Sequence, residues 1–98
     1  MSAFTFALCN EVLQPMPFEA QCRHAAALGY SGLEVAPFTL HEDPSALTLK
    51  QARVYASMAR DHGVPVTGLH WLLVAPSGLG ITAADPAVRL RTRDLVRH

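Results

Sequence analysis

One short pattern occurs twice in this chain of 98 residues, and it restricts the fold more than any other feature of the sequence. Residues 29–35 are Gly-Tyr-Ser-Gly-Leu-Glu-Val, and residues 63–71 are Gly-Val-Pro-Val-Thr-Gly-Leu-His-Trp. In both copies a glycine that can end a helix is followed by a short link, and then by Gly-Leu, a polar residue and an apolar residue. Glu34 and His70 occupy equivalent positions 36 residues apart. That spacing is about the length of one βα unit in a barrel of eight units.

The residues around the two copies predict strands and helices in alternation. Short apolar runs predict strands at residues 4–9, 32–36 and 65–71, and helical patterns predict helices at 17–28, at 49–61 and from 86 onward. The order β-α-β-α-β-α predicts an α/β fold with parallel strands. We interpret residues 1–98 as the first three units of a (β/α)8, or TIM, barrel, too short to close by itself.

The predicted helix ends rest on specific residue types. Thr48 followed by Gln51 is a capping box, in which each side chain satisfies a free backbone N–H. Asp85 before Pro86 is a strong start for the last helix. The apolar stripe of that helix continues to His98 without a stop signal, so we expect a barrel domain that is truncated here.

Polar side chains follow each of the three predicted strands. The carboxyl ends of parallel strands meet at one rim, and barrel enzymes build their chemistry there. This rim is expected to carry Asn10 and Glu11, then Glu34, and then His70 with Trp71. A carboxylate inside an apolar strand needs a partner, which favours a functional role for Glu34. The matching position of His70 favours the same role for the imidazole.

Three other residues have competing interpretations. His41 lies in the loop after the second strand, on the rim side, and is a candidate substrate contact. For Glu11 a solvated loop position is the simpler interpretation, and for Trp71 a place in the core or the pocket wall. Cys9 and Cys22 are interpreted as reduced thiols in the interior rather than as a disulfide. With no signal peptide or membrane span in the sequence, this favours a cytoplasmic location.

Composition narrows the classes of partner. Eight basic and eight acidic residues give a formal net charge of zero. This argues against a nucleic acid partner, because binding a polyanion requires a basic surface. The sequence has no Cys-x-x-Cys, no His-Glu-x-x-His and no glycine-rich phosphate loop, so it assigns no residue as a metal ligand.

Three segments resemble the N-terminal third of the sugar phosphate isomerase/epimerase group, within the xylose isomerase-like TIM barrel superfamily. They are Phe-Ala-Leu-Cys-Asn-Glu at 6–11, Ala-Leu-Gly-Tyr-Ser-Gly-Leu-Glu-Val at 27–35 and Gly-Leu-His-Trp at 68–71. The resemblance implies a sugar or sugar phosphate substrate, with Glu34 and His70 lining its pocket. It also implies one divalent metal (Mn, Mg, Co or Zn) held by Glu, Asp, His and Glu on later strands.

The resemblance therefore implies isomerase or epimerase activity for the intact parent, with proton transfer next to a metal-polarised carbonyl. The implied metal ligands lie beyond residue 98, so we expect this chain alone to bind no metal and to have no turnover. Two alternatives stay open. One is a non-catalytic chain that forms homo-oligomers through its open sheet edges. The other is a zinc-dependent phosphodiesterase like the abasic-site endonucleases, in which the position of His70 is a zinc ligand.

Overall fold

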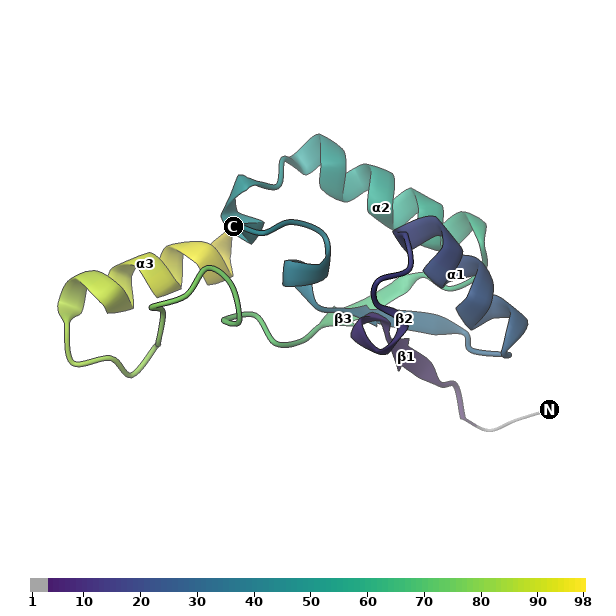
Figure 1. Cartoon of the computed structure of the whole chain (residues 1–98), viewed down its shortest axis with the longest axis horizontal. Helices are drawn as coiled ribbons and strands as arrows, with labels where there is room; N and C mark the ends of the chain where they lie inside the picture. Colours follow the sequence, from purple (N-terminus) through teal and green to yellow (C-terminus); the bar gives the residue numbers. More distant parts are fainter. Residues whose placement is uncertain (1–3) are drawn as a thin grey trace.

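The computed structural model describes residues 4–98 as a parallel sheet of three strands with three α-helices (Figure 1). β2 lies between β1 and β3 and pairs with both in parallel, which confirms the predicted α/β class. The strands and α-helices are β1 (Ala7–Cys9), α1 (Phe18–Ala27), β2 (Gly32–Val35), α2 (Leu49–Asp61), β3 (Val66–Leu69) and α3 (Pro86–Arg97). Short 3-10 helices are η1 (Asn10–Leu13), η2 (Pro37–Thr39) and η3 (Pro44–Ala46).

The helices begin and end where their capping residues require. Thr48 Oγ1 accepts a hydrogen bond from the backbone N–H of Gln51, and Gln51 Oε1 accepts one from the backbone N–H of Thr48, so the capping box is complete. At the start of α3 the Asp85 carboxylate accepts the backbone N–H of Ala87 at 2.9 Å. Gly29 and Gly63, with φ of +90° and +78°, follow the ends of α1 and α2 in the left-handed conformation that glycine adopts easily.

A β-bulge between β2 and β3 determines which face of the sheet His70 occupies. Leu33 pairs with Val66, but Glu34 pairs with Gly68, so β3 contains one extra residue, Thr67. Side chains alternate between the two faces of a strand, and a shift by one residue exchanges the faces. If β3 continued from Val66 in regular register, Thr67 would pair with Glu34, and His70 would then point to the opposite face from Glu34.

The two faces of the sheet differ in composition. Figure 1 shows α1 and α2 on one side of the sheet, and the core lies between these helices and the strands. The buried core residues are Cys22, Ala25, Leu33, Val35, Ala59 and Val64. On the other face the register aligns small and polar residues, namely Ala7, Cys9, Gly32, Glu34 and Gly68. No α-helix of the described residues covers that face.

The last helix, α3, lies beside the sheet and not against it (Figure 1). The Cα radius of gyration is accordingly 14.9 Å, above the roughly 12.6 Å expected for a compact domain of this length. The preceding loop holds α3 through buried Thr92, whose Oγ1 accepts the N–H of Gly80 at 2.9 Å. Nε2 of His98 lies 2.8 Å from the carbonyl oxygen of Leu47. The predicted third βα unit therefore has its helix, but that helix does not cover the sheet.

The two outer strands, β1 and β3, are shorter than predicted. β1 covers Ala7–Cys9 and not 4–9, and the backbone N–H of Ser31 donates to the Phe6 carbonyl at 2.9 Å just before the strand begins. β3 ends at Leu69, and Trp71 follows with φ of +53°, which an extended strand cannot accommodate. Cys9 and Cys22 are both free thiols. Among residues 4–98, no helix is long and apolar enough to cross a membrane.

Candidate functional site

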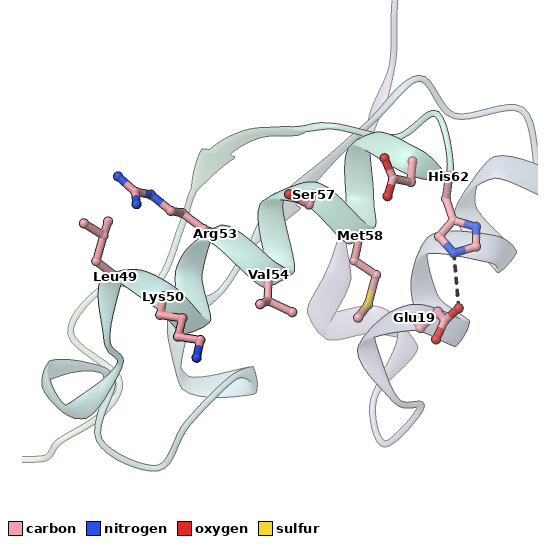
Figure 2. A pocket seen from close by; sticks show the side chains of 9 residues that line it. Glu19, Leu49, Lys50, Arg53, Val54, Ser57, Met58 and His62 are labelled. Atoms are coloured by element: carbon pink, nitrogen blue, oxygen red, sulfur yellow. Dashed lines mark ion pairs between the residues drawn. The ribbon is translucent and has the colours of Figure 1, made fainter.

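The surface is hollowed along the outer side of α2, but no reactive groups converge there. The hollow has a volume of about 580 Å³ and lies between α2 and the start of α1. Figure 2 shows the side chains along α2, among them Lys50 and Arg53, pointing in different directions. Its one ion pair among the described residues joins His62 Nε2 to Glu19 Oε1 at 3.5 Å on the molecular surface.

Three side chains from separate strand ends meet on the uncovered face of the sheet. The imidazole of His70 lies between two carboxylates, with Nδ1 at 3.4 Å from Glu34 Oε1 and Nε2 at 3.3 Å from Glu11 Oε1. The His70 side chain is only 12% exposed, whereas those of Glu11 and Glu34 are 25% and 41% exposed. The predicted proximity of these three residues is confirmed, and their role in binding stays a prediction.

The backbone explains this convergence. His70 continues the parallel ladder, because its N–H donates to the Val35 carbonyl at 3.1 Å. Its side chain is two residues beyond Gly68, the register partner of Glu34, and so points to the same face as Glu34. The turn η1 follows β1 directly and carries Glu11 across the end of the sheet to the far side of the ring.

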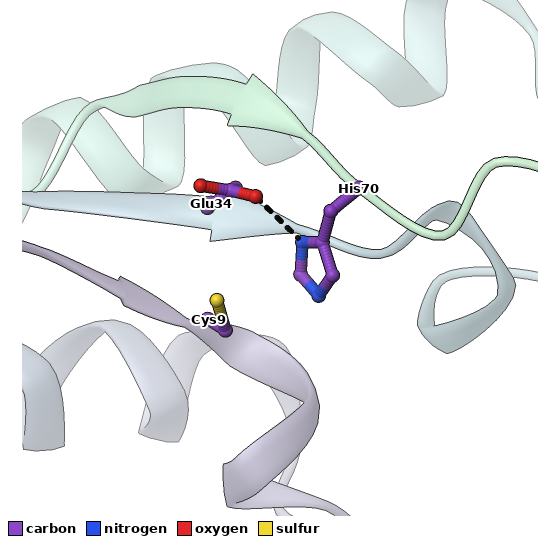
Figure 3. A group of neighbouring side chains, drawn as sticks. All are labelled: Cys9, Glu34 and His70. Atoms are coloured by element: carbon purple, nitrogen blue, oxygen red, sulfur yellow. Dashed lines mark ion pairs between the residues drawn. The ribbon is translucent and has the colours of Figure 1, made fainter.

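A fourth group, which the sequence analysis placed in the interior, belongs to this cluster. Cys9 is the register partner of Glu34 on the neighbouring strand. Its Sγ, a Glu34 carboxylate oxygen and a His70 ring nitrogen all lie within 4.8 Å of one another (Figure 3). Burial, followed by the negative charges of Glu34 and Glu11, raises the pKa of the Cys9 thiol above its usual value. Cys9 is therefore a neutral thiol at physiological pH in the metal-free cluster.

The ring nitrogens of His70 lie near the two carboxylates without forming aligned hydrogen bonds to them. A neutral ring carries one N–H and one lone pair, so one of the two carboxylates would face a lone pair. Both contacts are long for hydrogen bonds, and among the described residues neither buried ring nitrogen of His70 has a well-aligned hydrogen-bond partner. A bound cation at this place would be attracted by both carboxylates.

Asn10, which the sequence predicts as a substrate contact, has a structural role. The side chain is fully buried, and its amide donates to Gln21 Oε1 at 3.1 Å and to Thr39 Oγ1 at 2.7 Å. Its carbonyl oxygen accepts the backbone N–H of Ala36 at 2.8 Å. Both amide hydrogens are used, so Asn10 joins the first and second βα units and has no N–H left for a ligand. A polar residue after a strand does not by itself reveal this role.

Two further predicted residues lie outside the cluster. Trp71 is 61% exposed, so it does not lie in the core, and its alternative place in a pocket wall stays a prediction. Its left-handed backbone is a strained conformation directly after His70. His41 lies exposed in the loop after η2, where its Nδ1 accepts the backbone N–H of Asp43 at 2.9 Å. No ion pair or hydrogen bond of the described residues connects His41 to Glu34 or His70.

Comparisons with models of known protein families, with curated proteins and with solved structures give no match for this chain. The geometry of the strand ends is therefore the basis for the assignments that follow.

Proposed function

We propose that residues 1–98 form the sugar-binding wall of a (β/α)8 barrel of the sugar phosphate isomerase/epimerase type. The observation that carries this proposal is the His70 ring held between Glu11 and Glu34 at the carboxyl ends of parallel strands. Barrel enzymes place their active sites at this end. Partly exposed carboxylates beside an imidazole provide the acceptors and donors that adjacent sugar hydroxyls need.

The exposed indole ring of Trp71 lies next to His70 in sequence and supports the same proposal. The ring offers an apolar surface with one N–H donor, which suits the mixed surface of a sugar. The two free thiols, Cys9 and Cys22, support a reducing compartment such as the cytoplasm as the place of this function.

In this proposal Glu34 and His70 bind and orient the sugar hydroxyls, and the proton transfer belongs to residues on the later strands of the barrel. A divalent metal held by those later strands would polarise the sugar carbonyl. The present chain contributes the binding wall, and it is expected to bind sugar without converting it. Turnover of a ketose by the purified chain would contradict this division of roles.

The test is a titration of the purified chain with a ketose and a ketose phosphate, followed by two-dimensional NMR in the presence of a metal chelator. Shifts are expected at the strand ends around Glu34 and His70. Replacing either residue with Gln removes a charged or hydrogen-bonding group and should weaken binding at least about fivefold. Shifts elsewhere on the molecule, or equal binding by the variants, would contradict the proposal.

Matched control variants separate loss of the site from a general change of charge. Glu42→Gln and His24→Gln alter the same residue types at exposed positions outside the cluster. Both should bind sugar as the unaltered chain does. A loss of affinity in Glu42→Gln equal to that in Glu34→Gln would show that net charge, and not the cluster, controls binding.

A second candidate function, self-assembly without catalysis, is favoured by one observation. In the order β1-β2-β3, both outer strands have an edge without a strand partner in the described chain. On β3, Val66 and Leu69 are 37% and 58% exposed, and an open apolar edge is a template for pairing with another copy. Sedimentation velocity tests this proposal. The unaltered chain should form homo-oligomers, and these should dissociate when Leu69 is replaced by Lys. If the unaltered chain is a monomer at all concentrations, self-assembly is excluded.

A further inference from the structure

Three donor atoms of different chemistry point into one small volume on the uncovered face of the sheet. Figure 3 shows the Cys9 sulfur directed from its strand toward Glu34 and His70, and a Glu34 oxygen directed at the nearer ring nitrogen. Cys9 and Glu34 are direct register partners, and the bulge at Thr67 brings His70 to their face. The backbone therefore fixes the starting points of all three side chains.

The distances between these donors are close to those of a tetrahedral metal centre. With metal–ligand bonds of about 2.0–2.3 Å, neighbouring ligand atoms of a tetrahedron are separated by roughly 3.3–3.8 Å. Nδ1 of His70 and Oε1 of Glu34 are already 3.4 Å apart. The sulfur of Cys9 lies within 4.8 Å of a Glu34 carboxylate oxygen and of a His70 ring nitrogen, so sharing a metal ion requires a movement of at most about 1 Å, which side-chain rotation can supply.

Glu11 completes the arrangement from the other side of the ring. A metal ion on Nδ1 would fix the remaining hydrogen on Nε2, which lies 3.3 Å from Glu11 Oε1. A carboxylate that accepts the second N–H of a metal-bound imidazole orients the ring and increases its basicity. A cation between Glu34 and the ring would also be attracted by the Glu11 carboxylate on the other side of the ring.

We propose that Cys9, Glu34 and His70 form a zinc site in which Glu11 orients the imidazole. A sulfur, nitrogen and oxygen donor set suits Zn²⁺, whereas Mg²⁺ and Ca²⁺ prefer oxygen ligands alone. When the Zn–S bond forms, the thiol proton of Cys9 is released to solvent. Three protein ligands leave a fourth position for water or for an oxygen of a bound molecule. The proposal concerns the present chain alone and does not rest on the proposed function.

The first test uses Co²⁺ as a spectroscopic substitute for zinc in the purified, reduced chain. We expect one Co²⁺ per chain, a thiolate-to-cobalt charge-transfer band in the near ultraviolet, and loss of that band on addition of one equivalent of Zn²⁺. Cys9→Ser should abolish the band, and Cys22→Ala should retain it because Cys22 is buried in the core. Absence of the band, or an equal band in Cys9→Ser, would overturn the proposal.

The second test measures Zn²⁺ affinity by calorimetry and assigns the roles of the other residues. Glu34→Gln and His70→Gln should each weaken Zn²⁺ binding at least about tenfold, and Glu11→Gln about 10–100-fold while the Co²⁺ band is retained. His24→Gln, at an exposed position on α1, should bind as the unaltered chain does. Circular dichroism confirms that each variant is folded. If the Glu34→Gln and His70→Gln variants bind Zn²⁺ as tightly as the unaltered chain, zinc binds elsewhere.

A third measurement does not depend on any variant being folded. Zn²⁺ should protect one of the two cysteines of the unaltered chain, Cys9, from alkylation, and mass spectrometry identifies the modified residue. Unchanged alkylation of Cys9 at saturating Zn²⁺ would overturn the proposal. The sugar titration in chelator is a separate experiment, so failure of zinc binding and failure of sugar binding are distinguished.

Discussion

Replacing Gly32 with Ala tests the packing of the bulge that brings His70 and Glu34 to one face. A Cβ at position 32 would lie 2.6 Å from Thr67 Cγ2 and 3.2 Å from the Pro65 carbonyl oxygen. The first distance is too short for real carbon atoms, and the second involves backbone that accepts a hydrogen bond from Leu33 N–H at 3.0 Å. The strands therefore have to move apart, or the bulge has to rearrange.

These contacts determine how much Gly32→Ala should lower the free energy of unfolding. Overpacking of a well-filled site destabilises a protein by about 1–3 kcal/mol, and we expect roughly 2 kcal/mol for Gly32→Ala. Gly68 is the matched control on the neighbouring strand, because an added Cβ there meets no atom within 4 Å. Gly68→Ala should be neutral, or should stabilise by up to about 1 kcal/mol through the lower entropy of the unfolded chain.

A second substitution identifies the methyl group responsible. Thr67→Ser removes Cγ2 and keeps the hydroxyl that donates to the Leu33 carbonyl at 3.2 Å. In that background the cost of Gly32→Ala should fall by about 1 kcal/mol, as measured by urea denaturation followed by circular dichroism. Equal stability of the Gly32→Ala and Gly68→Ala variants, or no rescue by Thr67→Ser, would refute the proposed packing of the bulge.

Three further predictions concern the elements around the site. Asn10→Ala should cost about 2–4 kcal/mol in urea denaturation, because it leaves the buried N–H of Ala36 without its acceptor and removes two other hydrogen bonds; unchanged stability would contradict the structural role. Thr48→Ala should cost about 1 kcal/mol and Thr48→Ser only a few tenths, since serine retains the capping oxygen; equal losses would argue against the capping box. Hydrogen bonds from the side chain and the backbone N–H of Ser45 hold the pKa of Asp43 below its ordinary value of 3.8. Because this pKa is lowered by folding, the associated stability is present above pH 3.8 and is lost as the pH falls through the native pKa. NMR titration should show the Asp43 pKa rising toward 3.8 in Ser45→Ala, and an unchanged pKa would exclude the Ser45 hydroxyl as a cause.

The repeated pattern was sufficient to predict parallel strands and the meeting of Glu34 with His70. Both residues follow a Gly-Leu pair at the end of a strand, and parallel strands place such ends together. The capping residues Thr48 and Asp85 predicted the starts of α2 and α3 for an equally local reason. These features depend on a few adjacent residues, which is why the sequence alone could reveal them.

Features that depend on pairing between strands could not be predicted in this way. Cys9 is the last residue of an apolar run, which suggests an interior position, and only its register opposite Glu34 places its thiol in the cluster. The bulge at Thr67 depends on close packing against Gly32. Asn10 follows a strand as a ligand contact would, but the segments around Gln21 and Ala36 bury it.

The central claim is that parallel strand ends bring His70 between Glu34 and Glu11, and a crystal structure of the purified chain tests it most directly. The account predicts parallel pairing of all three strands, with Nδ1 of His70 close to 3.4 Å from Glu34 Oε1 in a metal-free crystal. Antiparallel pairing, or His70 and Glu34 on opposite faces of the sheet, would contradict it.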